Sequence, residues 1–233
     1  MRNTTKGYTL LEMLIGMMLI SLLMTGLVVS IHVGNQALAK GEAKLRQVHA
    51  AEERAQFMFQ QVACLVPYKV TSLNPDMLGD FFILEASATC LRFVSTYGTH
   101  NRDRAGLVWE EYAIVRTPRG GYVLALRETP VRDDTALLPL FIEGRSSDPD
   151  TGKSNLVYRP FLLRQSDLML MTGLQAARFE YFGVTSAGKE AGWASNWEAT
   201  PEAPYPEAVR FLWWRDGQQD QLVIPVRSRV MPK

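Results

Sequence analysis

The chain begins with an apolar run that limits what it can fold into. Residues 8–31 are 24 positions with one charge, Glu12. As a helix rising ~1.5 Å per residue, this run is about 36 Å long, enough to cross a hydrocarbon core of about 30 Å. Arg2 and Lys6 precede it, and the first basic residue after it is Lys40. Because positive charge stays on the cytoplasmic side, we expect residues 1–7 in the cytoplasm and everything after residue 31 across the membrane.

A cleaved secretory signal peptide and a plain signal anchor are the alternatives to a processed, retained span. A signal peptide has an apolar stretch of about 7–15 residues, followed by a cleavage site with small residues. Here the run is longer, and the sequence after it continues a helical pattern without a clear stop. Glu12 is also unusual in a signal peptide. A carboxylate within a span costs roughly 2.5–3.5 kcal/mol on insertion scales and is generally paired.

The residues around the start of the run carry a family resemblance. Lys6, Gly7, Tyr8, Thr9, Leu10, Leu11 and Glu12, followed by a span, resemble the class III leader of type IV pilins and of type II secretion pseudopilins. The resemblance implies cleavage after Gly7 by a prepilin peptidase and N-methylation of the new first residue, Tyr8. It also implies that Glu12 pairs with the N-terminal amine of a neighbouring subunit. The chain departs from the family at Tyr8, where phenylalanine is commonest, but an aromatic ring is retained.

The helix is predicted to continue beyond the membrane. Residues 32–65 contain no proline, and the first is Pro67. Apolar residues recur at helical spacing along one face, while charges fall largely on other faces. The apolar residues are Leu38, Leu45, Val48, Ala55, Met58, Val62 and Leu65. We therefore expect one helix of about 55 residues, with Gly34 and Gly41 as weak points. The predicted divisions are a leader at 1–7, a transmembrane helix at 8–31, an amphipathic continuation at 32–66 and a β-rich periplasmic head at 67–233.

After Pro67 the sequence changes to short β-type runs between turn residues. The predicted strands are residues 81–85, 90–95, 107–116, 122–128, 137–143, 156–163, 174–182, 208–214 and 221–226. Residues 117–121 and Asp216-Gly217 predict hairpins. Residues 146–154 and 183–206 are expected to be loops, and Glu110 and Glu111 indicate a solvated strand. The predicted fold class is α+β, with the long N-terminal helix packed on an antiparallel sheet.

The C-terminal half resembles one branch of the family. Residues 173–183, then Trp193 and Trp197 in a loop, then residues 206–211 and a closing strand to Pro225 are similar to the J-type minor pseudopilin of type II secretion. This resemblance implies a single-pass inner-membrane subunit at the pseudopilus tip, where it supports export of folded proteins. The implied partners are the I-type and K-type minor pseudopilins and the major pseudopilin. A W-type minor pilin of a type IV pilus is the alternative.

Other functions find little support in the sequence. The net charge of +1 argues against a nucleic-acid binder. No constellation for catalysis or for a metal or cofactor is visible, and we expect no enzyme activity. Asp148, Asp150 and Gly152 resemble a calcium loop, but Arg159 stands where the closing glutamate should be, so a solvated turn is expected. His49 is expected on the surface. Four tryptophans are candidates for either a partner surface or the core: Trp193, Trp197, Trp213 and Trp214.

The two cysteines leave two alternatives open. Cys64 lies at the end of the predicted helix and Cys90 opens a β-type run. A head in an oxidising compartment would allow a disulfide between them, tying helix to sheet. Such a bridge would be worth roughly 3–4 kcal/mol in the chain-entropy model. The alternative is two free thiols.

Overall fold

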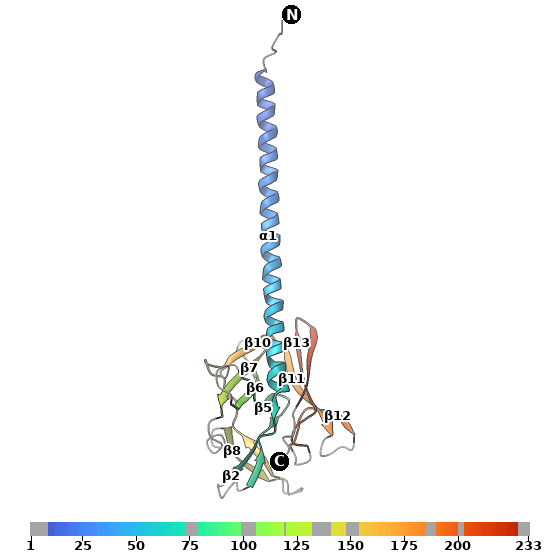
Figure 1. Ribbon diagram of the computed structural model, residues 1–233. Coiled ribbons are helices and arrows are strands. Elements are labelled where there is room, and N and C mark those ends of the chain that lie inside the picture. Colours follow the sequence, from blue (N-terminus) through green and yellow to red (C-terminus); the bar gives the residue numbers. More distant parts are fainter. Residues whose placement is uncertain are drawn as a thin grey trace, which may run out of the picture. The chain divides into compact units, whose positions relative to one another are not determined.

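The computed structural model describes residues 9–72, 79–98, 106–118, 120–131, 141–147, 154–184, 190–199 and 203–227. It contains one long helix, α1, over Leu10–Ala63, followed by antiparallel strands (Figure 1). This architecture confirms the predicted α+β fold class. The chain divides into two compact units, Met1–Glu53 and Arg54–Lys233. The second unit therefore begins inside α1, ten residues before the helix ends.

The first unit consists, in its described part, of helix α1 alone. The stretch Leu10–Arg46 is long and apolar enough to cross a membrane, and none of its most apolar window is buried within the protein. Its large apolar side chains are exposed from Leu10 through Val33. Among the described residues this surface stays exposed, as suits a helix that lies in an apolar environment such as lipid.

The second unit contains two sheets and two β-ribbons. The six-stranded sheet has the order β1-β5-β6-β7-β10, with β4 also paired to β5. Its strands are β1 (Leu65–Val66), β4 (Glu85–Ala86), β5 (Cys90–Ser95), β6 (Val108–Arg116), β7 (Tyr122–Pro130) and β10 (Leu168–Leu174). The four-stranded sheet, ordered β12-β11-β13-β14, comprises β11 (Ala176–Val184), β12 (Ala191–Ala194), β13 (Ala208–Arg215) and β14 (Gln218–Pro225). The ribbons pair β2 (Lys69–Ser72) with β3 (Gly79–Phe82), and β8 (Ile142–Ser147) with β9 (Ser154–Tyr158).

Turn chemistry explains two of the hairpin connections. Between β13 and β14, Asp216 and Gly217 both have positive φ, 52° and 75°, as a two-residue type I′ hairpin requires. Between β6 and β7, Gly120 and Gly121 have φ values of 87° and 77°. A Cβ on Gly121 would also lie 2.9 Å from the Leu174 carbonyl oxygen, so this position needs glycine for space as well.

The main core lies between the two sheets and takes in the end of α1. Met58 and Val62 from the last turns of the helix join the fully buried side chains of both sheets, which include Leu91, Phe93, Tyr112, Leu124, Phe179, Tyr181 and Phe211. A second, smaller core lies around Trp109 and Ile142, with Tyr68, Phe141 and Tyr158 packed against it. The aromatic side chains bury the largest areas here and set the spacing of the layers.

The strand predictions were wrong in several places. Glu110 and Glu111 are buried, with exposed fractions of 0% and 1%, where a solvated strand was expected. The stretch expected to be a loop at 183–206 contains β12 and an isolated bridge between Trp197 and Ala86. Strands β1, β2 and β10 were not predicted, and the strand predicted at 156–163 ends at Tyr158 as β9. Most of the strand predicted at 137–143 lies outside the described residues.

Of the two alternatives for the cysteines, the structure contains the second, because Cys64 and Cys90 are free thiols and form no disulfide. Strand geometry gives the reason. The Cys64 carbonyl accepts hydrogen bonds from Ser95 and Thr96, at the far end of β5, whereas Cys90 begins that strand. Five residues of strand span about 17 Å, and a disulfide needs Cα atoms within ~7 Å.

Candidate functional site

The first candidate site is the N-terminal end of α1, where Thr9 and Glu12 form a capping box. The Thr9 backbone N–H donates to Glu12 Oε2 at 2.9 Å, and the Thr9 hydroxyl donates to the same oxygen at 3.1 Å. In return the Glu12 N–H lies 3.3 Å from Thr9 Oγ1. The spacing Thr-x-x-Glu is the sequence signature of this motif, which satisfies donors at the open end of a helix.

This geometry gives Glu12 a role inside its own chain. Both hydrogen bonds that the Glu12 carboxylate accepts from Thr9 end on Oε2. Among the described residues none donates a hydrogen bond to Oε1. A capped Glu12 therefore still has an oxygen that can accept a hydrogen bond from an ammonium group of another chain. Gly7 and Tyr8 lie outside the described residues, so cleavage and methylation there stay predictions.

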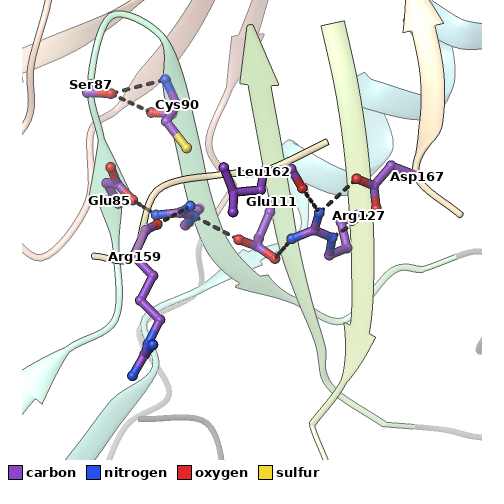
Figure 2. Close-up of polar contacts among 9 residues, drawn as sticks. Glu85, Ser87, Cys90, Glu111, Arg127, Arg159, Leu162 and Asp167 are labelled. Carbon is purple, nitrogen blue, oxygen red and sulfur yellow. Dashed lines mark hydrogen bonds and ion pairs between the residues drawn. The ribbon is translucent and has the colours of Figure 1, made fainter. Parts of the chain in front are cut away.

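A second site, missed by the sequence reasoning, is a row of alternating charges across the six-stranded sheet (Figure 2). We call Glu85, Arg92, Glu111, Arg127 and Asp167 the charge ladder. Arg92 pairs with Glu85, and its Nε donates to Glu111 Oε1 at 2.9 Å. Arg127 Nη1 lies 3.6 Å from Glu111 Oε2. Its Nε and Nη2 bind Asp167 bidentately at 2.9 and 2.7 Å.

Strand register creates the ladder. Glu85 lies opposite Arg92, Arg92 opposite Glu111, and Glu111 opposite Arg127 on four neighbouring strands. Burial raises the pKa of Glu111, while Arg92 and Arg127 oppose that shift. Burial also acts on Asp167, but hydrogen bonds from Arg127 and from the Arg164 backbone outweigh it and lower the pKa of Asp167. From Glu85 to Arg127 each charge is thus held by an opposite charge on the next strand, and Arg127 also binds Asp167, which immediately precedes β10.

The opposite face of the same sheet carries a different polar group, the glutamate cluster of Gln61, Glu110, Tyr112 and Glu128. Gln61, from α1, donates to Glu110 at 3.0 Å and to Glu128 at 2.6 Å. The Tyr112 hydroxyl donates to Oε1, the side-chain amide oxygen of Gln61. Burial, and then the neighbouring Glu128, raises the pKa of Glu110 to about 9. Glu110 is therefore a neutral acid at pH 7, where it can hold a proton on one of its oxygens.

The tryptophans divide between core and surface. Trp197 is buried, and its ring packs on Gly183, where an added Cβ would approach it to 2.7 Å. Trp193 is 38% exposed and lies under the Arg210 guanidinium, 4.2 Å from it, while Arg178 lies 5.4 Å over Trp214. Glu180 bonds both arginines, which together lower its pKa although burial acts against them.

The remaining candidates are a histidine on the helix and a suspected calcium loop. His49 is exposed on α1, 3.6 Å from Glu52. Asp148, Asp150 and Gly152 of the suspected calcium loop lie outside the described residues. In the part of the chain that is described, no group of three or more His, Cys, Asp or Glu side chains is placed to hold a metal ion.

The comparison with protein families agrees with the N-terminal geometry. Residues 2–28 match the prokaryotic N-terminal methylation motif. Among curated proteins no match to the chain was found. The matched residues contain the Gly7–Tyr8 bond, the Thr9–Glu12 capping box and the first half of the exposed apolar helix. The chain therefore carries the leader of a type IV pilin-like protein, together with one helix that can span a membrane.

Proposed function

We propose that the chain is a minor pseudopilin of the type II secretion system, of the J type. In this proposal a prepilin peptidase cleaves after Gly7, Tyr8 is methylated, and the head lies in the periplasm. The subunit assembles at the pseudopilus tip with the I-type and K-type minor pseudopilins and the major pseudopilin, and has no enzymatic activity. The observation that carries the proposal is the methylation motif at residues 2–28 leading into an exposed apolar helix.

The arrangement of the head supports the finer assignment. Of the residues that resemble the J type, Gly173 and Leu174 end β10, and most of the other described ones fall within β11, β12, β13 and β14, which form one four-stranded sheet. The resemblance therefore follows a folded unit instead of scattered short matches.

The first test concerns processing. Gly7→Val should block cleavage, because the peptidase requires a flexible peptide without a side chain at this position. Intact-mass analysis should then find a chain still carrying its seven leader residues. Gly16→Ala is the matched control, because a Cβ on Gly16 meets nothing within 4 Å. A mature N-terminus at Tyr8 in Gly7→Val would contradict the proposal.

The second test separates the two roles of Glu12. Glutamine can replace glutamate in a capping box, so Glu12→Gln keeps the cap and removes the charge, whereas Glu12→Ala removes both. If the charge pairs with a neighbour's amine, both variants should insert and be cleaved, yet both should lose crosslinking to the tip subunits and lose secretion. Loss in Glu12→Ala alone would assign Glu12 to helix capping, and wild-type behaviour of both would remove the assembly role.

A third test, with a deletion strain, distinguishes secretion from pilus assembly. A deletion of the gene should abolish export of type II substrates and leave pili intact, and the full-length chain should restore export. Loss of pili with normal export would instead favour the W-type minor pilin.

A further inference from the structure

The exposed apolar side chains of the head are concentrated in one short segment. Eight large apolar side chains are exposed in the described part of the second unit, and five of them fall between residues 157 and 169: Val157, Leu162, Leu163, Leu168 and Met169. Leu162 is the most exposed, at 73%. Connecting segments are normally polar at such positions, so this concentration needs a physical reason.

Buried charges fix the segment in place. We call residues 159–167, between β9 and β10, the anchored loop. Its backbone has neither helix nor strand structure, yet Arg92 Nη2 donates to the Arg159 carbonyl at 2.8 Å and Arg127 Nη2 to the Leu162 carbonyl at 2.7 Å (Figure 2). Asp167 accepts the Arg164 N–H at 2.7 Å, and Phe161 lies 4.3 Å under the Arg127 guanidinium. Contacts from Arg92 and Arg127 of the charge ladder therefore hold the loop on the sheet.

This anchoring orders the apolar side chains before any partner arrives. Buried ion pairs contribute little net stability compared with well-packed apolar residues, so their effect here is to define geometry. Ordering a leucine-rich loop in advance removes an entropic cost from later binding. The loop thus has the properties of a preorganised contact surface.

The polar rim of this surface is basic. Between residues 157 and 169 the charged residues are Arg159, Arg164 and Asp167. Both arginines are exposed, whereas Asp167 is buried and neutralised by Arg127. A partner with acidic groups beside its apolar contact would therefore be favoured over a basic one.

The adjoining strand β10 argues for side-chain docking over strand addition. In the described residues β10 is the last strand of the six-stranded sheet, and its pairing with β7 has two register shifts, at Met169/Met171 and Met171/Leu174. Such irregularities protect an edge from pairing with a further strand. An amphipathic helix makes no backbone ladder and binds through an apolar stripe.

We propose that the anchored loop and the start of β10 form a docking surface for an amphipathic helix whose apolar stripe is flanked by acidic residues. Leu162, Leu163 and Met169 contact the stripe, and Arg159 and Arg164 contact the acidic flank. The proposal goes beyond the proposed function and does not depend on the type of secretion or pilus machinery.

The test uses the full-length chain in neutral phosphatidylcholine nanodiscs, with empty nanodiscs as the blank. The probes are two labelled twenty-residue helical peptides with the same leucine stripe, flanked by glutamates in one and by lysines in the other. Fluorescence anisotropy should give at least tenfold tighter binding of the glutamate peptide, weakening as salt increases. Equal or stronger binding of the lysine peptide, or no binding of either, would overturn the proposal.

Variants of the exposed residues complete the test. Leu162→Ser with Leu163→Ser should weaken binding at least tenfold, and Arg159→Glu with Arg164→Glu should reverse the preference between the two peptides. Val184→Ser with Arg116→Glu is the matched control, because both of its positions are exposed elsewhere on the head. All substituted side chains lie at the surface, so circular dichroism should be unchanged. Leucine-dependent binding of anionic vesicles, with no peptide binding, would identify a lipid surface and overturn the helix proposal.

Discussion

Two neighbouring glutamates on β6 show how the two faces of one sheet handle a buried carboxylate. Glu110 faces the end of α1 and Glu111 faces the anchored loop, and both are buried. Among the described residues Glu110 meets an amide and a second glutamate, and burial, followed by the charge of Glu128, raises its pKa to about 9. Glu111 lies between Arg92 and Arg127. One face thus buries a neutral acid, and the other buries an ion pair.

The difference follows from what each face holds. Gln61 of α1 donates to the protonated Glu110 and to Glu128, so hydrogen bonds join the helix end to this face beside the apolar packing of Met58 and Val62. The charge ladder uses guanidinium groups, whose many donors reach carboxylates and backbone carbonyls at once. It can therefore hold a loop that has no secondary structure of its own. The comparison leads to four predictions, measured by urea unfolding of the full-length protein. All five tryptophans lie after Arg54, so their fluorescence reports the head alone.

The largest effect is expected for Arg92→Met. Removing this cation leaves the buried Glu111 and the half-buried Glu85 without their main partner, which should lower the free energy of unfolding by about 3–5 kcal/mol. Arg178→Met is the control, because its bridge to Glu180 is half-exposed and should contribute less than about 1 kcal/mol. Similar losses in both variants would show that the ladder is no more than a surface ion pair.

A smaller and more selective effect is expected for the two glutamine substitutions. Glu111→Gln should cost about 1–3 kcal/mol at pH 7, because Arg92 and Arg127 lose a shared carboxylate but keep Glu85 and Asp167. Glu110→Gln should cost less than about 1 kcal/mol, because it replaces a neutral acid by a neutral amide. Unfolding curves of the two variants at the same pH provide the comparison. The reverse order would contradict the assignment of charge to the two faces.

The pH dependence should carry the signature of Glu110. Its folded pKa is about 9 against an ordinary value of 4.5, so between these values the folded state keeps a proton that the unfolded state releases. Stability should therefore fall as pH rises through this window, by at most about 1.4 kcal/mol per unit. Asp167, with its lowered pKa, acts in the other direction and only in acid, where its stabilising effect is lost as pH falls. Glu110→Gln should flatten the profile from pH 5 to 9, and parallel profiles would refute the neutral-acid assignment.

Local spacing was sufficient to predict much of the fold. The long helix, β5 and the Asp216-Gly217 hairpin each depend on residues close together in the chain, and each was found. The Thr9–Glu12 cap also follows from adjacent residues, although the sequence reasoning assigned Glu12 only to a partner chain. These features need periodicity, turn chemistry and little else.

The charge ladder and the glutamate cluster could not be found this way. Arg92, Glu111 and Arg127 meet only because three strands pair in one register, and nothing local specifies that register. Two adjacent glutamates are typical of a solvated strand, and only their distant partners explain their burial. Strand β10 was missed because its sequence, LMLMTGL, has no alternation of apolar and polar residues. The cysteine alternatives depended on the path of β5 relative to the helix end, which is also a long-range property.

The smallest effect is expected for Tyr112→Phe, which tests whether the glutamate cluster acts as one network. The Tyr112 hydroxyl is fully buried and donates to Gln61, whose amide group in turn donates to Glu110 and Glu128. Removing the hydroxyl leaves the side-chain oxygen of Gln61 without this donor, which should lower the free energy of unfolding by about 1 kcal/mol. Because Gln61 fixes both glutamates, the loss should also change the pH profile between 5 and 9, which a simple packing defect would not do. Combining Tyr112→Phe with Glu110→Gln should therefore give less than the sum of the two separate losses. Strict additivity would mean that the helix end is held by independent contacts, and that the two faces of the sheet differ in charge but not in cooperativity.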